Sequence, residues 1–159
     1  MSVRPMSTSR RKALGVSGLA VAATLMGAAV APAPAAADDG DRTKTVACES
    51  LHVDDRNGNV HAKTRNCTVT WGKNIIDGAY WQTVKFQLLD ARSDGVCGYA
   101  NVIASDTGNS KRVKECNGVW TTRTASFSGR SSNIFIRVAY GDNSVYGNIS
   151  TNVPRPSGF

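Results

Sequence analysis

The residue types best suited to acid–base or metal chemistry gather in one short stretch, LHVDDRNGNVHAK, at residues 51–63. It contains both histidines of the chain, His52 and His61, together with Asp54 and Lys63. Two imidazoles beside a carboxylate could bind a metal, or act as acid and base in phosphodiester cleavage. The stretch therefore raises the hypothesis of a small extracellular hydrolase or nuclease that uses His52, Asp54 and His61.

A β-hairpin would position these side chains. Asn57-Gly58 favours a two-residue turn, and folding the chain about it pairs residues whose numbers sum to 115. His52 then faces Lys63, Asp54 faces His61, and all four side chains share one face of the hairpin. No other segment predicts an enclosing wall, so we favour a solvent-exposed face, with no catalytic residue, metal or cofactor there. The chain also lacks G-x-S-x-G, H-E-x-x-H and phosphate-loop motifs, which argues against an enzyme.

The same register places two cysteines opposite each other. Cys48 and Cys67 sum to 115, so we expect a disulfide at the base of the hairpin. Cys97 and Cys116 have the same spacing around DTGN, residues 106–109, and predict a second clamped hairpin. An even number of cysteines indicates disulfides, and this spacing is not that of zinc ligands. The apolar phase slips on both strands of the first hairpin, which predicts a β-bulge on each.

Residues 1–37 have the pattern of a cleaved signal peptide. Basic residues precede the uncharged, alanine-rich stretch 13–31, and small residues at Ala35 and Ala37 precede Asp38, the expected mature start. The pattern fits the general secretory and the twin-arginine routes equally. The signal holds four of the 19 basic residues and none of the 12 acidic ones, which leaves 15 basic residues and a net charge of +3. We therefore expect a secreted protein that does not bind nucleic acid and has no membrane span after cleavage.

The remainder of the chain predicts an all-β fold. TVKFQLL and NIFIRVAY alternate apolar and polar residues at period two, and turn-forming residues separate the short strands. Strands are expected within or near residues 45–54, 60–71, 83–89, 97–105, 119–128, 133–140 and 144–150. Their number and spacing predict a small, disulfide-stapled antiparallel β-sandwich or barrel.

The chain also suggests an internal repeat of about 50 residues. Cys48, Cys67 and Trp71 recur as Cys97, Cys116 and Trp120 at an offset of 49. We predict an N-terminal arm and first strand at 38–47, one β domain at 48–150 with repeat-like units 48–96 and 97–150, and a C-terminal tail at 151–159. Both tryptophans are expected to pack on the disulfides in the core.

Two surface features could support recognition. The connection NIIDGAYWQT carries Tyr80 and Trp81, which with Tyr140 and Tyr146 could form an aromatic platform for sugar rings or a protein partner. The alternative is that Trp81 caps one end of the sandwich. The run NSKRVKE could display Lys111 and Arg112 on a loop between two cysteines, as an inhibitor of a trypsin-like protease would.

Three functional hypotheses follow. The first is a secreted, non-catalytic module that binds an extracellular glycan, a cell-envelope component or a protein. It rests on the small size, the paired cysteines, the β-strand pattern and the absence of catalytic motifs. The second is a protease inhibitor that uses Lys111 and Arg112, and the third is the hydrolase that uses His52, Asp54 and His61. We favour the first, with Tyr80 and Trp81 as its main binding residues.

Overall fold

The computed structural model describes residues 40–141 and 148–159, and every regular element in these ranges is a β-strand. The signal-peptide prediction lies outside the described residues. Among the described residues, no helix exists that could cross a membrane. The strands are β1 (Asp41–Ala47), β2 (His52–Asp54), β3 (Val60–Asn74), β4 (Tyr80–Asp90), β5 (Gly98–Ala104), β6 (Asn109–Glu115), β7 (Thr121–Ser128), β8 (Asn133–Tyr140) and β9 (Asn148–Pro154).

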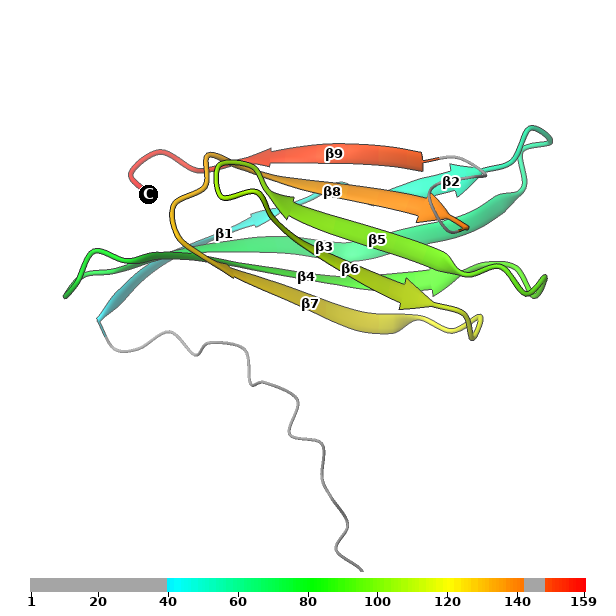
Figure 1. Ribbon diagram of the computed structural model, residues 1–159, viewed down its shortest axis with the longest axis horizontal. Coiled ribbons are helices and arrows are strands. Elements are labelled where there is room, and N and C mark those ends of the chain that lie inside the picture. Colours follow the sequence, from blue (N-terminus) through cyan, green and yellow to red (C-terminus); the bar gives the residue numbers. More distant parts are fainter. Residues whose placement is uncertain (1–39, 142–147) are drawn as a thin grey trace, which may run out of the picture. The chain divides into compact units, whose positions relative to one another are not determined.

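The strands form two antiparallel sheets packed face to face, so the predicted sandwich is confirmed (Figure 1). Sheet A has the order β1-β3-β4-β7, with β2 also paired to β3, and sheet B has the order β6-β5-β8-β9. The chain passes from sheet A to sheet B after β4, returns after β6 and crosses again after β7. β9 continues to Pro154, and Val153 within it is buried.

The core lies between the sheets and is built by period-two alternation. Val69, Val84 and Ala125 stand side by side on β3, β4 and β7, and all three are buried. Sheet B contributes the buried alternate residues of β5 and β8, including Val102 and Ile136. Residues between these positions face outward, so each sheet has one apolar and one solvated face.

Both predicted disulfides are present, Cys48–Cys67 and Cys97–Cys116. β1 pairs with β3 in the predicted register, from Asp41 opposite Asn74 to Ala47 opposite Thr68, and Cys48 donates its N–H to the Cys67 carbonyl at 3.0 Å. Disulfides form in oxidising environments, which fits an extracellular protein.

The hairpin turn differs from the prediction. Asp55 donates its N–H to the Asn59 carbonyl, which leaves a three-residue loop, and in this loop only Gly58 has a positive φ, 76°. A three-residue loop of this kind ends in a left-handed residue and shifts the pairing by one. Asp54 therefore faces Val60, and a register shift between Val53 and Asp54 restores the expected pairing farther along.

The two predicted repeat units differ in their strand pairing. In the first unit β4 pairs with β3, the second strand of its hairpin, whereas in the second unit β8 pairs with β5, the first strand of its hairpin. Trp71 is buried in the core as predicted, but Trp120 is only partly buried, so the prediction of a second core tryptophan is wrong. The internal duplication stays a prediction from the sequence.

Candidate functional site

The predicted histidine cluster is only partly assembled. His52 faces Lys63 as expected, but the one-residue shift moves Asp54 opposite Val60. His52 keeps Asp54 as its neighbour, with Nε2 3.6 Å from Oδ2, and both side chains are exposed. His61 has other partners, so the three residues of the hydrolase hypothesis do not share one site.

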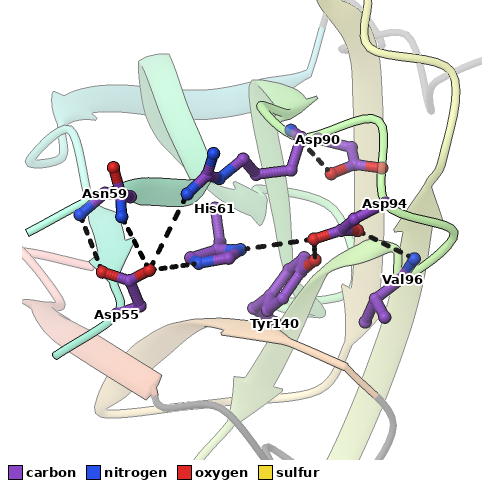
Figure 2. A network of polar contacts seen from close by, with 8 residues as sticks. Asp55, Asn59, His61, Asp90, Asp94, Val96 and Tyr140 are labelled. Atoms are coloured by element: carbon purple, nitrogen blue, oxygen red, sulfur yellow. Dashed lines mark hydrogen bonds and ion pairs between the residues drawn. The ribbon is translucent and has the colours of Figure 1, made fainter. Parts of the chain in front are cut away.

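His61 instead lies between two aspartates from different loops (Figure 2). Its Nε2 is 3.3 Å from Asp55 Oδ2, its Nδ1 is 3.8 Å from Asp94 Oδ2, and its ring centre is 4.1 Å from that of Tyr140. Tyr140 in turn donates its hydroxyl hydrogen to Asp94. Hydrogen bonds from Asn59 hold the pKa of Asp55 well below its usual range, and the Tyr140 hydroxyl lowers the pKa of Asp94.

This network joins the loops at one end of the sandwich. It connects the β2–β3 turn, the β4–β5 loop and the end of β8, which belong to both sheets. The His61 side chain is only 12% exposed, and no group of residues in the described ranges is arranged to hold a metal ion. The contacts of this network are those of a structural clamp that holds loops of both sheets together.

The other predicted site residues are dispersed. Tyr140 is 1% exposed, so its ring does not lie on the surface, and Tyr146 is outside the described residues. Lys111 and Arg112 are exposed but lie within β6, paired with β5, rather than in a loop. The Arg112 guanidinium lies over the Tyr99 ring, 4.1 Å from its centre. The protruding loop of the inhibitor hypothesis is therefore absent at these residues.

Tyr80 and Trp81 point to opposite faces of β4, because successive residues of a strand alternate. Trp81 lies on the outer face of sheet A, above Gly72 of the neighbouring strand. A Cβ atom on Gly72 would come within 2.0 Å of the indole ring, so glycine there is what allows the ring to lie against the sheet. The indole N–H donates to Asp41 Oδ2 at 2.7 Å, which fixes the ring on this surface.

The outer face of sheet A is rich in hydroxyl side chains, and we call it the hydroxyl face. Cross-strand pairing places its residues in rows, one of which runs Thr45, Thr70, Thr83 and Ser126 across four strands. None of these side chains is buried. Its serines and threonines are Thr43, Thr45, Thr68, Thr70, Thr83, Thr122, Thr124, Ser126 and Ser128.

Hydrogen bonds within this row order its hydroxyl groups. Thr45 and Thr70 are joined through their Oγ1 atoms at 3.0 Å, and Thr83 Oγ1 is 3.2 Å from Ser126 Oγ. Each hydroxyl has one donor and two acceptor positions, so one contact to a neighbour leaves capacity for a ligand. The row is therefore a pre-ordered set of donors and acceptors on a rigid sheet.

A second tryptophan lies at the other end of the hydroxyl face. Trp120, just before β7, is covered on one side by the Arg65 guanidinium, 4.0 Å from the centre of its ring, and Lys63 Nζ lies 5.6 Å from that centre. Arg65 also donates from Nε to Gln87 Oε1 at 2.7 Å. Gln87 is six residues from Trp81 on β4, so the two aromatic groups stand about 20 Å apart along the strands.

Three shallow hollows lie along the same face, two of them between the tryptophans and one beside Trp120. The first, of about 310 Å³, is lined by Trp81, Thr83, Ser126 and their neighbours. The second, of about 340 Å³, is lined by residues that include Lys85, Gln87 and Thr122. The third, of about 360 Å³, lies beside Trp120 and is lined by residues that include His52, Lys63 and Arg65. The hydroxyl face therefore combines aromatic ends, hydrogen-bonding groups and concave surface.

Sequence reasoning selected Trp81 but missed Trp120 and the hydroxyl rows. The signal was present in the alternation itself, because TRTASFS in β7 and TVTW in β3 put threonine or serine at every second position. The strand order is also needed, because it shows which of these hydroxyl-bearing strands are neighbours in the sheet. Comparisons of the chain with protein-family models, with curated proteins and with solved structures found no match.

Proposed function

We propose that this protein is a secreted, non-catalytic binding module that recognises an extracellular polysaccharide through the hydroxyl face. The observation that carries the proposal is the ordered Thr and Ser rows lying between Trp81 and Trp120 on one rigid sheet. The predicted signal peptide and the two disulfides support export, since disulfides persist in oxidising compartments.

The chemistry of the face matches that of a sugar chain. A pyranose ring has an apolar face of C–H groups that packs on an aromatic ring, and its hydroxyl groups both donate and accept hydrogen bonds, as threonine and serine do. Indole rings add large contact area at low entropic cost, and Trp81 is already held by Asp41. The separation of about 20 Å between the tryptophans exceeds a single sugar ring and therefore favours a chain over a monosaccharide.

Sedimentation with insoluble polysaccharides tests the proposal. Cellulose, chitin and purified bacterial cell wall would be incubated with the mature chain and with Trp81→Ala, Trp120→Ala and the double variant. We expect retention by at least one polysaccharide, a loss of affinity of about tenfold or more for each single variant, and a larger loss for the double variant.

Phe135→Ala is the matched control, because Phe135 is an exposed aromatic residue on the outer face of sheet B. This variant should be retained as well as the unaltered protein. Equal losses for Phe135→Ala and Trp81→Ala, or unaltered retention of the double tryptophan variant, would contradict the proposal.

A further inference from the structure

The end of the sandwich opposite to His61 has an exposed apolar tip. The turn between β3 and β4 carries Ile75 and Ile76, whose exposed fractions are 61% and 85%. Figure 1 shows this turn at the same end of the sandwich as the chain's C-terminus. The Ile75 N–H donates to the Gly40 carbonyl at 3.1 Å, which joins the tip to the residue just before β1. Two adjacent exposed isoleucines at a hairpin tip are unfavourable in water unless a partner covers them.

Three cations surround the aromatic ring at the base of this tip. Lys73 Nζ, Arg130 Cζ and Arg155 Cζ lie 5.2, 5.6 and 6.0 Å from the centre of the Tyr80 ring. They come from β3, the β7–β8 turn and the residue after β9, so the fold gathers them from distant parts of the chain. Within the described residues, none of the three forms an ion pair with a carboxylate.

The acidic residues near this end already have partners. Asp41 accepts from the Trp81 indole, and Asp77 accepts from the Ala79 N–H within the tip. Asp106 accepts from the N–H and hydroxyl of Ser132, and its pKa is lowered chiefly by the Ser132 side chain, with a smaller contribution from Arg155. An external anion would provide the missing partner for these cations.

We propose that this end of the sandwich docks on a lipid surface that carries anionic phosphate headgroups. Ile75 and Ile76 would enter the apolar layer, while Lys73, Arg130 and Arg155 meet the phosphates, and Tyr80 lies at the interface where amphipathic aromatic rings are favoured. The combination of an apolar tip with a collar of cations favours a membrane over a free phosphate ion, because a free ion would leave the isoleucines uncovered. The inference goes beyond the proposed polysaccharide binding and uses different residues.

Vesicle sedimentation at physiological ionic strength tests this inference. The mature chain would be mixed with phosphatidylcholine vesicles, with and without phosphatidylglycerol. We expect binding only to the anionic vesicles, weakened about fivefold by Arg130→Gln or by Arg155→Gln, since a basic residue near such a surface contributes about 1 kcal/mol. Ile76→Ser should weaken binding by about tenfold, because it removes a side chain buried in the lipid.

Matched controls separate docking from general adsorption. Arg137→Gln removes an exposed cation from the outer face of sheet B, and Val119→Ser removes an exposed apolar side chain at the opposite end. Both should bind the vesicles as the unaltered protein does, and so should Trp120→Ala, which tests the hydroxyl face alone. Melting curves would confirm that all variants are folded.

Three outcomes would overturn the inference. One is equal binding to neutral and anionic vesicles. Another is unaltered vesicle binding by Ile76→Ser together with weakened binding by Arg155→Gln, which would mean electrostatic adsorption without insertion. The third is competition by inorganic phosphate that fully releases the protein, which would identify a soluble anion as the ligand.

Discussion

The pKa values of two buried acids near the His61 end of the sandwich are shifted in opposite directions. Asp90 and Glu115 are equally buried, but burial raises the pKa of Asp90, whose neighbours Asp94 and Glu115 add repulsion. Burial also opposes ionisation of Glu115, yet hydrogen bonds and an ion pair with Arg123 at 2.9 Å lower its pKa overall. Charge at Asp90 is therefore unfavourable in the folded protein, whereas charge at Glu115 is compensated.

We expect Asp90→Asn to stabilise the protein at neutral pH and to change little in acid. A carboxyl whose folded pKa is raised contributes stability that is complete below its unfolded pKa and is lost as pH rises through the folded value. The amide keeps an oxygen to accept the Arg92 N–H and never ionises. The melting temperature of the variant minus that of the unaltered protein should grow between about pH 3 and pH 7.

The control for this prediction is Glu49→Gln, which removes an exposed carboxylate. Its melting temperature should follow that of the unaltered protein throughout the range. If the melting temperatures of Asp90→Asn and the unaltered protein differed by the same amount at all pH values, the pKa of Asp90 would not be raised in the folded protein.

At the scale of single residues, the sequence was sufficient for some features and not for others. Trp81 could be chosen because it stands beside turn-forming residues, but the glycine that accommodates its ring is Gly72 on the facing strand, not the adjacent Gly78. Because successive side chains of a strand alternate, the sequence alone already places Tyr80 and Trp81 on opposite faces of the sheet. The burial of Tyr140 could not be anticipated, because it depends on loops that come together from both sheets.

At the scale of the elements, β3 determines the geometry of the site. It changes phase at a bulge where Asn66 has a positive φ of 52°: Ala62 and Thr64 face the core before the bulge, and Cys67 and Val69 face it after. A bulge of this kind lets one strand keep its buried face while it turns. The slip in apolar phase predicted the bulge on β3. On the opposite strand, where a second bulge was expected, the structure instead has two separate strands, β1 and β2. The turn length could not be predicted, since Asn-Gly also fits a longer loop.

The pairing of β3 with β4 leads to a prediction at Gly72. Gly72→Ala should weaken polysaccharide binding about as much as Trp81→Ala, roughly tenfold, because the added methyl group collides with the indole and moves it off the sheet. All the hydroxyl groups and both tryptophans remain present in this variant. The measurement is the same sedimentation assay, accompanied by a melting curve.

Gly40→Ala is the matched substitution, because its new Cβ would meet Ile75 at an ordinary contact distance of 3.4 Å. It should bind polysaccharide normally. If Gly72→Ala also bound polysaccharide normally, the position of the Trp81 ring against the sheet would not matter for recognition.

At the scale of the whole molecule, the sandwich separates three surfaces. The hydroxyl face covers sheet A, the His61 network closes one end, and the tip with its cations occupies the other. β6, one of the two edge strands of sheet B, carries Lys111, Arg112 and Lys114, and charged edges of this kind prevent strand-to-strand association. Alternation and cysteine spacing were enough to predict a disulfide-stapled sandwich, but which strands are neighbours depends on crossings between sheets that local patterns do not encode.

The most direct test of polysaccharide recognition is to map the bound surface by NMR. Isotope-labelled protein would be titrated with soluble oligosaccharides of the polysaccharide that retains it best. We expect the largest chemical-shift changes at the Trp81 indole N–H and at Thr45, Thr70 and Thr83, with Phe135 and Arg137 on the outer face of sheet B unchanged. Shifts concentrated on sheet B or around His61, with the hydroxyl rows unchanged, would contradict this expectation.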